Sequence, residues 1–253
     1  MQHSSTLTID IGNTRVKYTL FQNGKVTRNS WSDTVSNNEI SNIYRTNDIS
    51  RTLISSVDDK KYHGITDILN SKHIPYSVLN HHTPLPFNIA YHTPNTLGLD
   101  RIAALAGGMS LYPSQPLLVI DIGTCITYDI LIDNTFIGGN IAPGVQMRLD
   151  AMHHFTSALP AANIDIATPP IGQSTTSAMQ AGAYWGVVYE IISYIKRYQT
   201  EHPQLLTIIT GGGAQWVIDN LHDITNIVMQ PMLVPIGLNF IATNLSNEYN
   251  NKQ

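Results

Sequence analysis

The sequence predicts an α/β fold in two domains, and three observations support this prediction. The segment Leu-Thr-Ile-Asp-Ile-Gly-Asn-Thr at residues 7–14 recurs as Leu-Val-Ile-Asp-Ile-Gly-Thr-Cys at residues 118–125. Each copy continues into a strand-like run and then a hairpin signal, which is strong for Asn23-Gly24 and weaker for Asp133-Asn134. In the rest of the chain, short apolar runs alternate with segments of helical periodicity.

The first half of the chain is expected to open with a meander of three strands around the first glycine turn. A polar stretch at residues 32–42 then leads toward a short helix, and three prolines make residues 83–96 an irregular loop. The elements between and after these segments are a buried strand at 52–57, a helix at 60–72, a short strand at 76–79 and an alanine-rich helix at 97–107.

The second half is expected to repeat the meander and to continue with more helix. Pro113 and Pro116 mark the joint, so the predicted domains are residues 1–114 and 115–253. The expected elements are a meander at 117–140, a turn at 141–144, a helix at 145–154, an irregular stretch at 159–175, a helix at 177–198, a strand at 205–209, a glycine-rich turn at 210–213, a short helix at 214–221, a strand at 227–229 and a closing helix at 236–245.

Composition excludes several classes of protein. Apolar residues make up 42% of the chain, which is enough for real cores, and the net charge of −4 is unlike that of a nucleic-acid-binding domain. The single cysteine cannot form an internal disulfide and favours a reducing compartment. With no signal peptide or membrane-spanning run expected, the predicted location is the cytoplasm. The ten histidines lack the spacing of metal ligands.

The first glycine turn, residues 10–17, has the chemistry of a phosphate site. Gly12 lets backbone N–H groups approach phosphate oxygens, Asn13 and Thr14 add side-chain donors, and either Arg15 or Lys17 could meet a β- or γ-phosphate. Asp10 lies in an apolar run, where Mg²⁺ would compensate its charge. The simpler alternative is a hairpin whose Asp only accepts hydrogen bonds from turn amides.

The second turn lacks a basic residue, so it is less suited to holding phosphates by charge. Asp121 could hold a cation, and Thr124 could reach a phosphate oxygen. The alternative is a structural repeat left by duplication. If the two turns face each other, two carboxylates and two glycine turns would line one nucleotide cleft.

Three further segments are candidates. In Gly98-Leu99-Asp100-Arg101, Asp100 could be a helix N-cap, or it could orient a substrate hydroxyl while Arg101 binds a carboxylate. The glycine-rich turn at 210–213 could approach a nucleotide or simply join a strand to a helix. Small residues at Ala178, Gly182 and Gly186 permit tight helix contact, either in the core or at a subunit interface.

Taken in order, these motifs resemble the type III pantothenate kinases. The resemblance runs from about residue 6 to residue 245, and the motifs that carry it are Asp10-Ile-Gly-Asn-Thr-Arg-Val-Lys17, Gly98-Leu-Asp-Arg101, Asp121-Ile-Gly-Thr124, Gly138-Gly-Asn-Ile-Ala-Pro-Gly144, Ser174 to Gly182 and Thr210-Gly-Gly212. It implies two actin-like (ribonuclease H-like) domains related by duplication, within the sugar-kinase/Hsp70 superfamily. The implied reaction is ATP-dependent phosphorylation of the 4′-hydroxyl of pantothenate, the first step of coenzyme A biosynthesis.

The resemblance also implies cofactors, partners and residue roles. The implied cofactors are ATP, Mg²⁺ and a monovalent cation, K⁺ or NH₄⁺, and the implied assembly is a homodimer, for which helix 177–198 is the candidate interface. Asp100 would be the catalytic base, and Asp121 would bind the monovalent cation. The implied ATP residues are Asp10, Ile11, Gly12, Asn13, Thr14, Arg15, Val16, Lys17 and Thr124. The implied substrate residues are Tyr91, Gly98, Leu99, Asp100, Arg101 and Thr175, with Thr176 as an alternative to Thr175.

The chain departs from the family pattern at two positions, and two other functions stay open. Leu99 replaces a residue that is usually smaller, and Cys125 stands where alanine is more usual. One alternative function is an actin-fold kinase for another small hydroxy substrate, because fold alone does not choose the substrate. The other is a nucleotide-binding accessory protein without catalysis, which the joint presence of Asp10, Lys17, Asp100 and Asp121 argues against.

Overall fold

The computed structural model describes residues 5–250, without the side chains of residues 246–250, and divides into two compact units. Unit 1 contains the chain up to Pro113 and again from Met232 onward, and unit 2 is the continuous segment Ser114–Pro231. The sequence-based boundary lies beside this division, but it assigned the C-terminal helix to the second domain. In the structure that helix belongs to unit 1.

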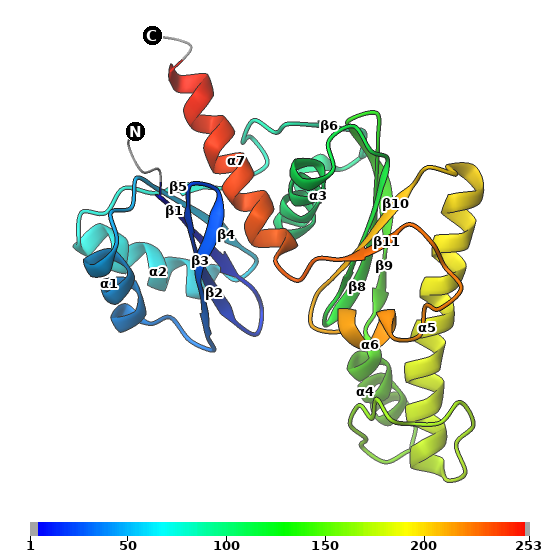
Figure 1. Cartoon of the computed structure of the whole chain (residues 1–253). Helices are drawn as coiled ribbons and strands as arrows, with labels where there is room; N and C mark the ends of the chain where they lie inside the picture. The colour runs from blue at the N-terminus through cyan, green and yellow to red at the C-terminus, as the bar shows by residue number, and fades with distance from the viewer. Residues whose placement is uncertain (1–4, 251–253) are drawn as a thin grey trace. The chain divides into compact units, whose positions relative to one another are not determined.

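Unit 1 is built on a mixed sheet with the strand order β3-β2-β1-β4-β5 (Figure 1). β1 pairs antiparallel with β2 and parallel with β4. The first three strands are the predicted meander, and Asn23 and Gly24 both have the positive φ that a tight hairpin needs. The strands are β1 (Ser5–Ile11), β2 (Val16–Gln22), β3 (Lys25–Ser32), β4 (Arg51–Ser56) and β5 (Ser77–Val78).

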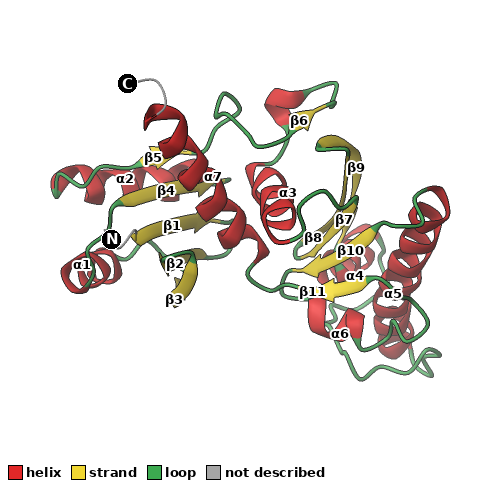
Figure 2. Cartoon of the chain, turned by 45° about the horizontal axis from the view of Figure 1, so that its top comes forward, coloured by secondary structure: helices red, strands yellow, loops and turns green. Residues whose placement is uncertain are grey.

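Helices cover both faces of the unit 1 sheet (Figure 2). On one face, α1 and α2 bury isoleucines and leucines against β1, including Ile40, Ile43, Ile65 and Leu69. On the other face, α7 contacts β1 and β4. The helices are α1 (Asn37–Thr46), α2 (Asp59–Ser71), α3 (Leu99–Leu111) and α7 (Leu233–Asn250); the predicted irregular loop also holds β6 (Asn88–Ile89) and the 3₁₀ turn η1 (Pro94–Thr96).

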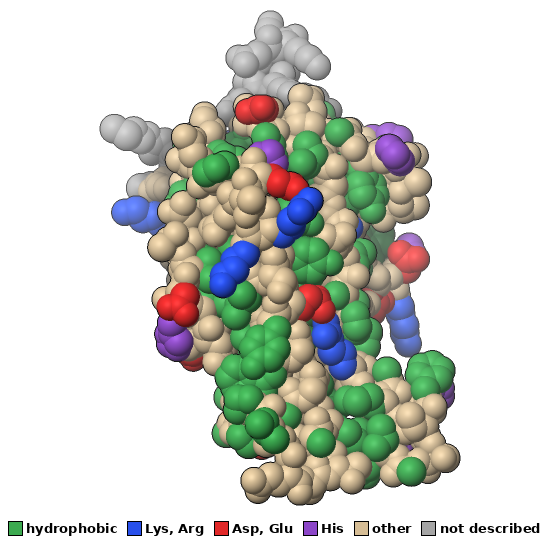
Figure 3. Space-filling view, turned by 90° about the vertical axis from the view of Figure 1, so that its right-hand side faces the viewer, with side chains coloured by type: hydrophobic (Ala, Val, Ile, Leu, Met, Phe, Trp, Pro, Cys, Tyr) green, Lys and Arg blue, Asp and Glu red, His purple; other side chains and the backbone are tan. Residues whose placement is uncertain are grey.

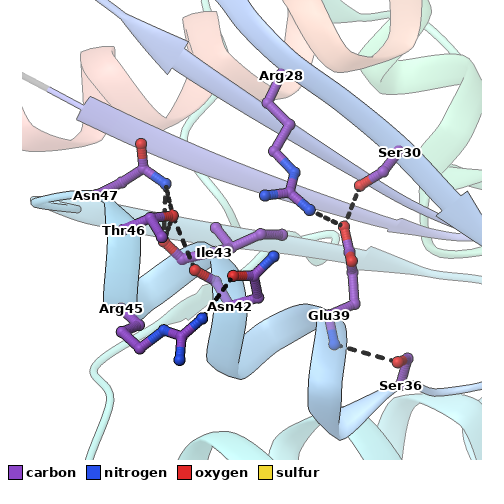
Figure 4. Close-up of polar contacts among 9 residues, drawn as sticks. All are labelled: Arg28, Ser30, Ser36, Glu39, Asn42, Ile43, Arg45, Thr46 and Asn47. Carbon is purple, nitrogen blue, oxygen red and sulfur yellow. Dashed lines mark hydrogen bonds and ion pairs between the residues drawn. The ribbon is translucent and has the colours of Figure 1, made fainter.

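Polar side chains fix α1 to the edge of this sheet (Figure 4). Arg28 on β3 donates to Oε1 of Glu39 at 2.8 Å, and Ser30 donates to the same oxygen at 2.5 Å. Ser36 caps the helix by accepting the N–H of Glu39 at 3.2 Å. The short helix expected after β3 is therefore present, but it begins at Asn37, within the polar stretch 32–42 that was expected to be a loop.

α3 and α7 cross with their backbones in contact, which explains why the C-terminal helix belongs to unit 1. A Cβ on Gly107 would collide with the carbonyl group of Leu233, and a Cβ on Gly237 would lie 2.7 Å from the N atom of Gly107. Only glycine allows helices to approach this closely. A pair of glycines far apart in sequence therefore joins the last helix to the helix that carries Asp100.

Unit 2 repeats the topology of unit 1, with strands in the order β11-β10-β7-β8-β9. β7 pairs antiparallel with β8 and parallel with β10, just as β1 does with β2 and β4. The strands are β7 (Leu117–Ile122), β8 (Cys125–Ile132), β9 (Thr135–Pro143), β10 (Leu206–Thr210) and β11 (Ile227–Met229). β9 continues through most of the turn predicted at 141–144, because Ile141 and Ala142 pair with β8.

The duplication extends to local detail. The second strand of each unit pairs with the third through a register shift, between Leu20 and Phe21 in unit 1 and between Ile130 and Leu131 in unit 2. Asp10 lies opposite Lys17, and Asp121 lies opposite Thr127. Between the last paired residues, the second turn is one residue shorter than the first, since Ile122 pairs with Ile126 and Ile11 with Val16. Apart from this difference, the repeated phrase in the sequence corresponds to a repeated fold.

The helices of unit 2 pack on the sheet face that carries Leu118 and Ile120. They are α4 (Val145–Phe155), α5 (Thr175–Glu201) and α6 (Ala214–Ile218). α5 is longer than predicted at both ends, and at its start Ser174 and Ser177 form a capping box. Figure 3 views the side of the molecule that carries α5, where hydrophobic side chains are numerous toward the lower end. Among the described residues, no helix is both long and apolar enough to cross a membrane.

Candidate active site

The first turn, residues 12–15, connects β1 to β2 and is closed by a hydrogen bond from Gly12 N–H to the carbonyl of Arg15 at 2.9 Å. Ile11 and Val16 on either side are fully buried, so they can offer a ligand only backbone groups. Asn13 and Thr14 are exposed. This is the geometry expected of a loop whose tip is open to an anionic ligand.

Lys17 lies beside Asp10 at the base of this turn. Its Nζ is 3.5 Å from Oδ2 of Asp10, and the Asp10 side chain is 13% exposed while that of Lys17 is 51% exposed. Of the two basic residues in the motif, Arg15 points elsewhere, because its guanidinium stacks 3.9 Å from the ring of Trp31 and pairs with Asp33 at 3.6 Å. Lys17 is thus the basic side chain nearest to the buried carboxylate.

The negative charge of Asp100 acts on the carboxyl of Asp10 within unit 1. Burial raises the pKa of Asp10 above its usual value, the Lys17 ammonium lowers it, and the negative charge of Asp100 raises it further. Burial and the charge of Asp100 both disfavour the ionised form of Asp10, and a bound cation would compensate that negative charge.

Asp100 is the second residue of α3, not its cap. Gly98 occupies the N-cap position, and Oδ1 of Asp100 accepts the N–H of Arg101 at 2.9 Å. The alternative of Asp100 as a helix N-cap is therefore wrong. Upstream, Nε2 of His81 lies 2.9 Å from the carbonyl of Leu97, which holds the chain where it enters this helix.

Arg101 and Tyr91, two predicted substrate residues, lie together. The Arg101 side chain is buried, and its guanidinium carbon is 5.9 Å from the centre of the Tyr91 ring. Leu99 and Gly98 beside them are partly buried. The substrate segment proposed from the sequence is thus one cluster in unit 1, together with Asp100.

In unit 2, two glycines form backbone hydrogen bonds at the second turn. Gly123 N–H donates to the carbonyl of Cys125 at 3.0 Å, and Gly144 N–H donates to the carbonyl of Thr124 at 3.0 Å. The side chains of Thr124 and Cys125 remain exposed. Two motifs that are separate in sequence, the second turn and the Gly138–Gly144 segment, therefore meet.

Asp121 lies against the glycine-rich turn that follows β10. Gly211 has a φ of +89°, and a Cβ there would meet a carboxylate oxygen of Asp121 and lie 2.6 Å from the carbonyl oxygen of Ile122. Gly213 N–H donates to that same carbonyl at 2.9 Å. The part of the chain that the structure describes holds no group of three or more His, Cys, Asp or Glu residues arranged around a metal.

Thr175 is the first residue of α5 and is exposed, as is Thr176. Thr175 and Thr176 are therefore alike in exposure, and both stay candidates for the substrate contact. Both lie beside the capping box, where Ser174 accepts the N–H of Ser177 at 3.2 Å.

Sequence reasoning missed two charged groups that support the turns. In unit 1, Lys61 on α2 donates to the carbonyls of Gly12 and Asn13. In unit 2, Arg148 donates to the carbonyl of Pro143 at 2.8 Å and pairs with Glu190 at 2.6 Å. Lys61 could have been found from the parallel pairing of β1 and β4, since the segments that follow parallel neighbours meet at one edge.

Comparison with known proteins gives one family. The model of the family described as type III pantothenate kinase matches residues 6–197. A type III pantothenate kinase of Bacteroides fragilis is 37% identical over 81% of this chain and 85% of its own length. That of Cytophaga hutchinsonii is 33% identical over 96% of this chain and 99% of its own.

Solved structures are similar in fold at much lower identity. A conserved protein of the Baf family of transcriptional activators from Campylobacter jejuni has a TM-score of 0.59 and 21% identity, with 95% of this chain and 99% of that chain covered. The activator of 2-hydroxyisocaproyl-CoA dehydratase from Clostridium difficile, solved with bound ADPNP, has a TM-score of 0.55 and 12% identity, with 98% of each chain covered. These neighbours identify the actin-like ATPase fold.

Proposed function

Since this chain belongs to the type III pantothenate kinase family, we propose that the two turns and the carboxylates beside them form its ATP and pantothenate sites. The protein is an ATP-dependent kinase that transfers the γ-phosphoryl group of ATP to the 4′-hydroxyl of pantothenate, the first step of coenzyme A biosynthesis. The proposal concerns which residues perform each part of that reaction. The observation that supports it most is the pair of Lys17 and the largely buried Asp10, 3.5 Å apart at the base of the first turn.

The first turn, residues 10–17, binds the ATP phosphates in this proposal. The exposed residues Asn13 and Thr14 offer N–H groups and side-chain donors, and Lys17 supplies a positive charge next to them. Thr124 on the second turn, whose side chain is exposed, is a further proposed ATP contact. Phosphoryl transfer depends mostly on positioning and charge neutralisation, which these groups can supply.

Mg²⁺ is the cation that fits Asp10. The buried carboxyl with its raised pKa, close to a second carboxyl, is stabilised in its charged form by a divalent ion. Mg²⁺ usually binds one or two carboxylates together with substrate phosphates, so a single Asp is a sufficient protein contribution. When bound, the ion would neutralise charge that develops on the phosphate oxygens.

Asp100 is the proposed catalytic base. Its Oδ1 already accepts the N–H of Arg101, so the carboxylate is oriented at the start of α3 and can accept a hydrogen bond from the pantothenate 4′-hydroxyl. Arg101 and Tyr91, which lie together, would bind the substrate carboxylate and its backbone. Gly98, Leu99 and Thr175 complete the proposed substrate contacts.

Asp121 is the proposed ligand of a monovalent cation, K⁺ or NH₄⁺. Its carboxylate lies against Gly211 and near the Ile122 carbonyl, and oxygen-rich surroundings of this kind suit a hard cation. The ion would offset negative charge near the second turn, which has no lysine or arginine of its own.

We further propose a cytoplasmic homodimer. The reducing cytoplasm suits the exposed thiol of Cys125. For the dimer, the N-terminal half of α5 presents Gly182, which has open space around it, and Tyr189, which is 55% exposed. A small residue and an exposed aromatic on one helix face suit contact with a second copy of the chain.

The test of the proposed function is a coupled assay with ATP, Mg²⁺ and a panel of hydroxy acceptors. We expect turnover with pantothenate in K⁺, little with other acceptors, and a collapse of the rate when Na⁺ replaces K⁺. Equal rates in the two salts would remove the monovalent cation from the proposal. Turnover of another acceptor in preference to pantothenate would refute the substrate assignment.

A further inference from the structure

Lys61 makes contacts that a surface lysine does not ordinarily make. Its ammonium donates to the carbonyl of Gly12 at 3.2 Å and to the carbonyl of Asn13 at 2.6 Å, and it pairs with Asp58 at 3.8 Å. The Lys61 side chain is only 19% exposed. One ammonium group therefore holds two successive carbonyls of the first turn.

The fold of unit 1 fixes the position of this lysine. β4 runs parallel to β1 with Ser56 beside Ile11, and Val57 N–H donates to the Ile11 carbonyl at 3.0 Å. Asp58 then caps α2 by accepting the N–H of Lys61 at 2.9 Å. The chain entering α2 is thus held against the end of β1, which brings the Lys61 ammonium within hydrogen-bonding distance of the first turn.

The two carbonyls that Lys61 holds determine where the neighbouring N–H groups point. In a planar trans peptide the C=O and the N–H of the same unit point in opposite directions. With the carbonyls of Gly12 and Asn13 drawn toward Lys61, the N–H groups of Asn13 and Thr14 are directed away from it. Neither of these N–H groups has a hydrogen-bond acceptor within residues 5–250.

Successive unpaired N–H groups on one side of a turn form a concave site for an anion. We infer that Lys61 is a positioning residue, which holds residues 12–14 in the conformation that receives the ATP phosphates before nucleotide arrives. This inference rests on the proposed role of the first turn in binding ATP. A turn that is already ordered loses less conformational entropy on binding, so the contribution of Lys61 would appear mainly in nucleotide affinity.

The test measures the affinity of the full-length protein for Mg²⁺ and AMPPNP by titration calorimetry. We expect Lys61→Met to raise the Kd for AMPPNP at least tenfold, and Lys61→Arg to restore most of the affinity. The matched control is Lys60→Met, which removes the same charge from an exposed neighbour on the same helix and should leave the Kd within twofold of wild type. If Lys61→Met does not fold, Lys61→Gln replaces it.

Steady-state kinetics separate positioning from a general loss of structure. A positioning role predicts that Lys61→Met raises the KM for ATP while the KM for pantothenate changes less than twofold. An equal rise of both KM values in Lys61→Met would overturn the inference. An AMPPNP affinity of Lys61→Met equal to that of Lys60→Met would also overturn it.

A third variant, Lys17→Met, distinguishes failure of this inference from failure of the proposed ATP site. If Lys17→Met weakens AMPPNP binding tenfold and Lys61→Met does not, the first turn binds ATP but Lys61 does not position it. If both variants bind AMPPNP as wild type does, the proposed site is wrong and the inference falls with it. If both variants bind AMPPNP more weakly than wild type, the result supports both the proposed ATP site and the positioning role of Lys61.

Discussion

Lys17 and Asp10 are direct partners across the β1–β2 hairpin, with Nζ of the lysine 3.5 Å from Oδ2 of the aspartate. The equivalent pair in unit 2 is Asp121 and Thr127, which cannot form an ion pair. The two copies of the fold therefore differ in charge at the same structural position. The first turn has a lysine opposite its carboxylate, whereas the second has an uncharged threonine at that position.

Asp10→Asn is expected to stabilise the nucleotide-free protein at neutral pH and to abolish turnover. Burial raises the pKa of Asp10 above its ordinary 3.8, so the folded state favours the protonated form. The stabilising contribution of this group is complete below pH 3.8 and is lost as the pH rises through the folded-state pKa. Asparagine resembles the protonated form, so the variant is expected to be more stable than wild type above that pKa.

Urea denaturation at several pH values checks this expectation for Asp10. The stability difference between the variant and wild type should shrink as the pH falls below the folded-state pKa of Asp10, where both side chains are neutral. With saturating Mg²⁺ and AMPPNP, wild type should become more stable than the variant, because only wild type keeps the proposed ligand of the ion. A variant that is less stable than wild type by the same amount at every pH would contradict the argument.

Asp100→Asn is expected to lower kcat by about 10²- to 10⁴-fold while the KM for ATP stays nearly constant. The fold should persist, because the lost interaction of a negative charge with the first turn of α3 is worth only about 0.3–1 kcal/mol. The coupled assay and a thermal melt measure the two effects. Turnover near that of wild type would remove Asp100 from the role of base.

The same variant offers a second, independent measurement. Asp100 contributes to the raised pKa of Asp10, so removing its charge should lower the pKa of Asp10. The carboxyl ¹³C shift of Asp10, followed by NMR against pH in wild type and Asp100→Asn, reports this directly. An unchanged Asp10 titration would mean that the two carboxyls do not interact.

Gly211→Ala should be far more damaging than Gly212→Ala. At Gly211 the backbone has a φ of +89° and an added Cβ would collide with Asp121 and with the backbone of Ile122, whereas at Gly212 an added Cβ meets nothing within 4 Å. We expect a loss of at least ~2 kcal/mol in unfolding free energy for Gly211→Ala and little change for the control. Activation by K⁺ should weaken as well, because the carboxylate of Asp121 is displaced.

Chemical denaturation and a K⁺ titration of the rate measure these two effects of the glycine variants. If Gly211→Ala lowers stability but leaves the K⁺ dependence unchanged, Asp121 is not the cation ligand. If the two variants are equally stable, the described contact between Gly211 and Asp121 is incorrect.

Gly182→Leu should weaken the proposed dimer without unfolding the chain. Gly182 has open space around it in the single chain, so a larger side chain costs nothing there and raises helix propensity. In a close contact between two copies the same side chain would prevent approach. Thr200→Leu, at an exposed position near the other end of α5, is the matched control. Sedimentation velocity that finds both variants as dimeric as wild type would exclude this helix face as the interface.

The sequence was sufficient to predict the duplicated α/β fold, because the repeated Asp-Ile-Gly segment and the hairpin signals are local patterns. The two meanders and the parallel strands that follow them occur where the periodicity predicted them. It was not sufficient to assign α7, since the contact of Gly237 with Gly107 depends on residues far apart in the chain. No window of local sequence contains both glycines.

The candidate site shows the same division between local and long-range information. The turns and their carboxylates are contiguous motifs, and the structure brings Asp10 under the influence of Asp100, and Tyr91 beside Arg101. Lys61 and Arg148 were missed because their role is to hold backbone carbonyls, and a carbonyl carries no sequence signal. The N-cap alternative for Asp100 was wrong, because Gly98, two residues earlier, occupies the N-cap position without a side-chain cap.

The C-terminal helix of unit 1 has a consequence for the order in which the protein matures on the ribosome. Unit 2 is one uninterrupted stretch, so it can fold as soon as residue 231 has left the exit tunnel. Unit 1 is complete only after α7 has been synthesised, because Gly107 of α3 packs against Gly237 of α7. The half of the enzyme translated first is therefore the half completed last, and nascent chains that stall before Met232 would expose an unfinished N-terminal half to chaperones and proteases.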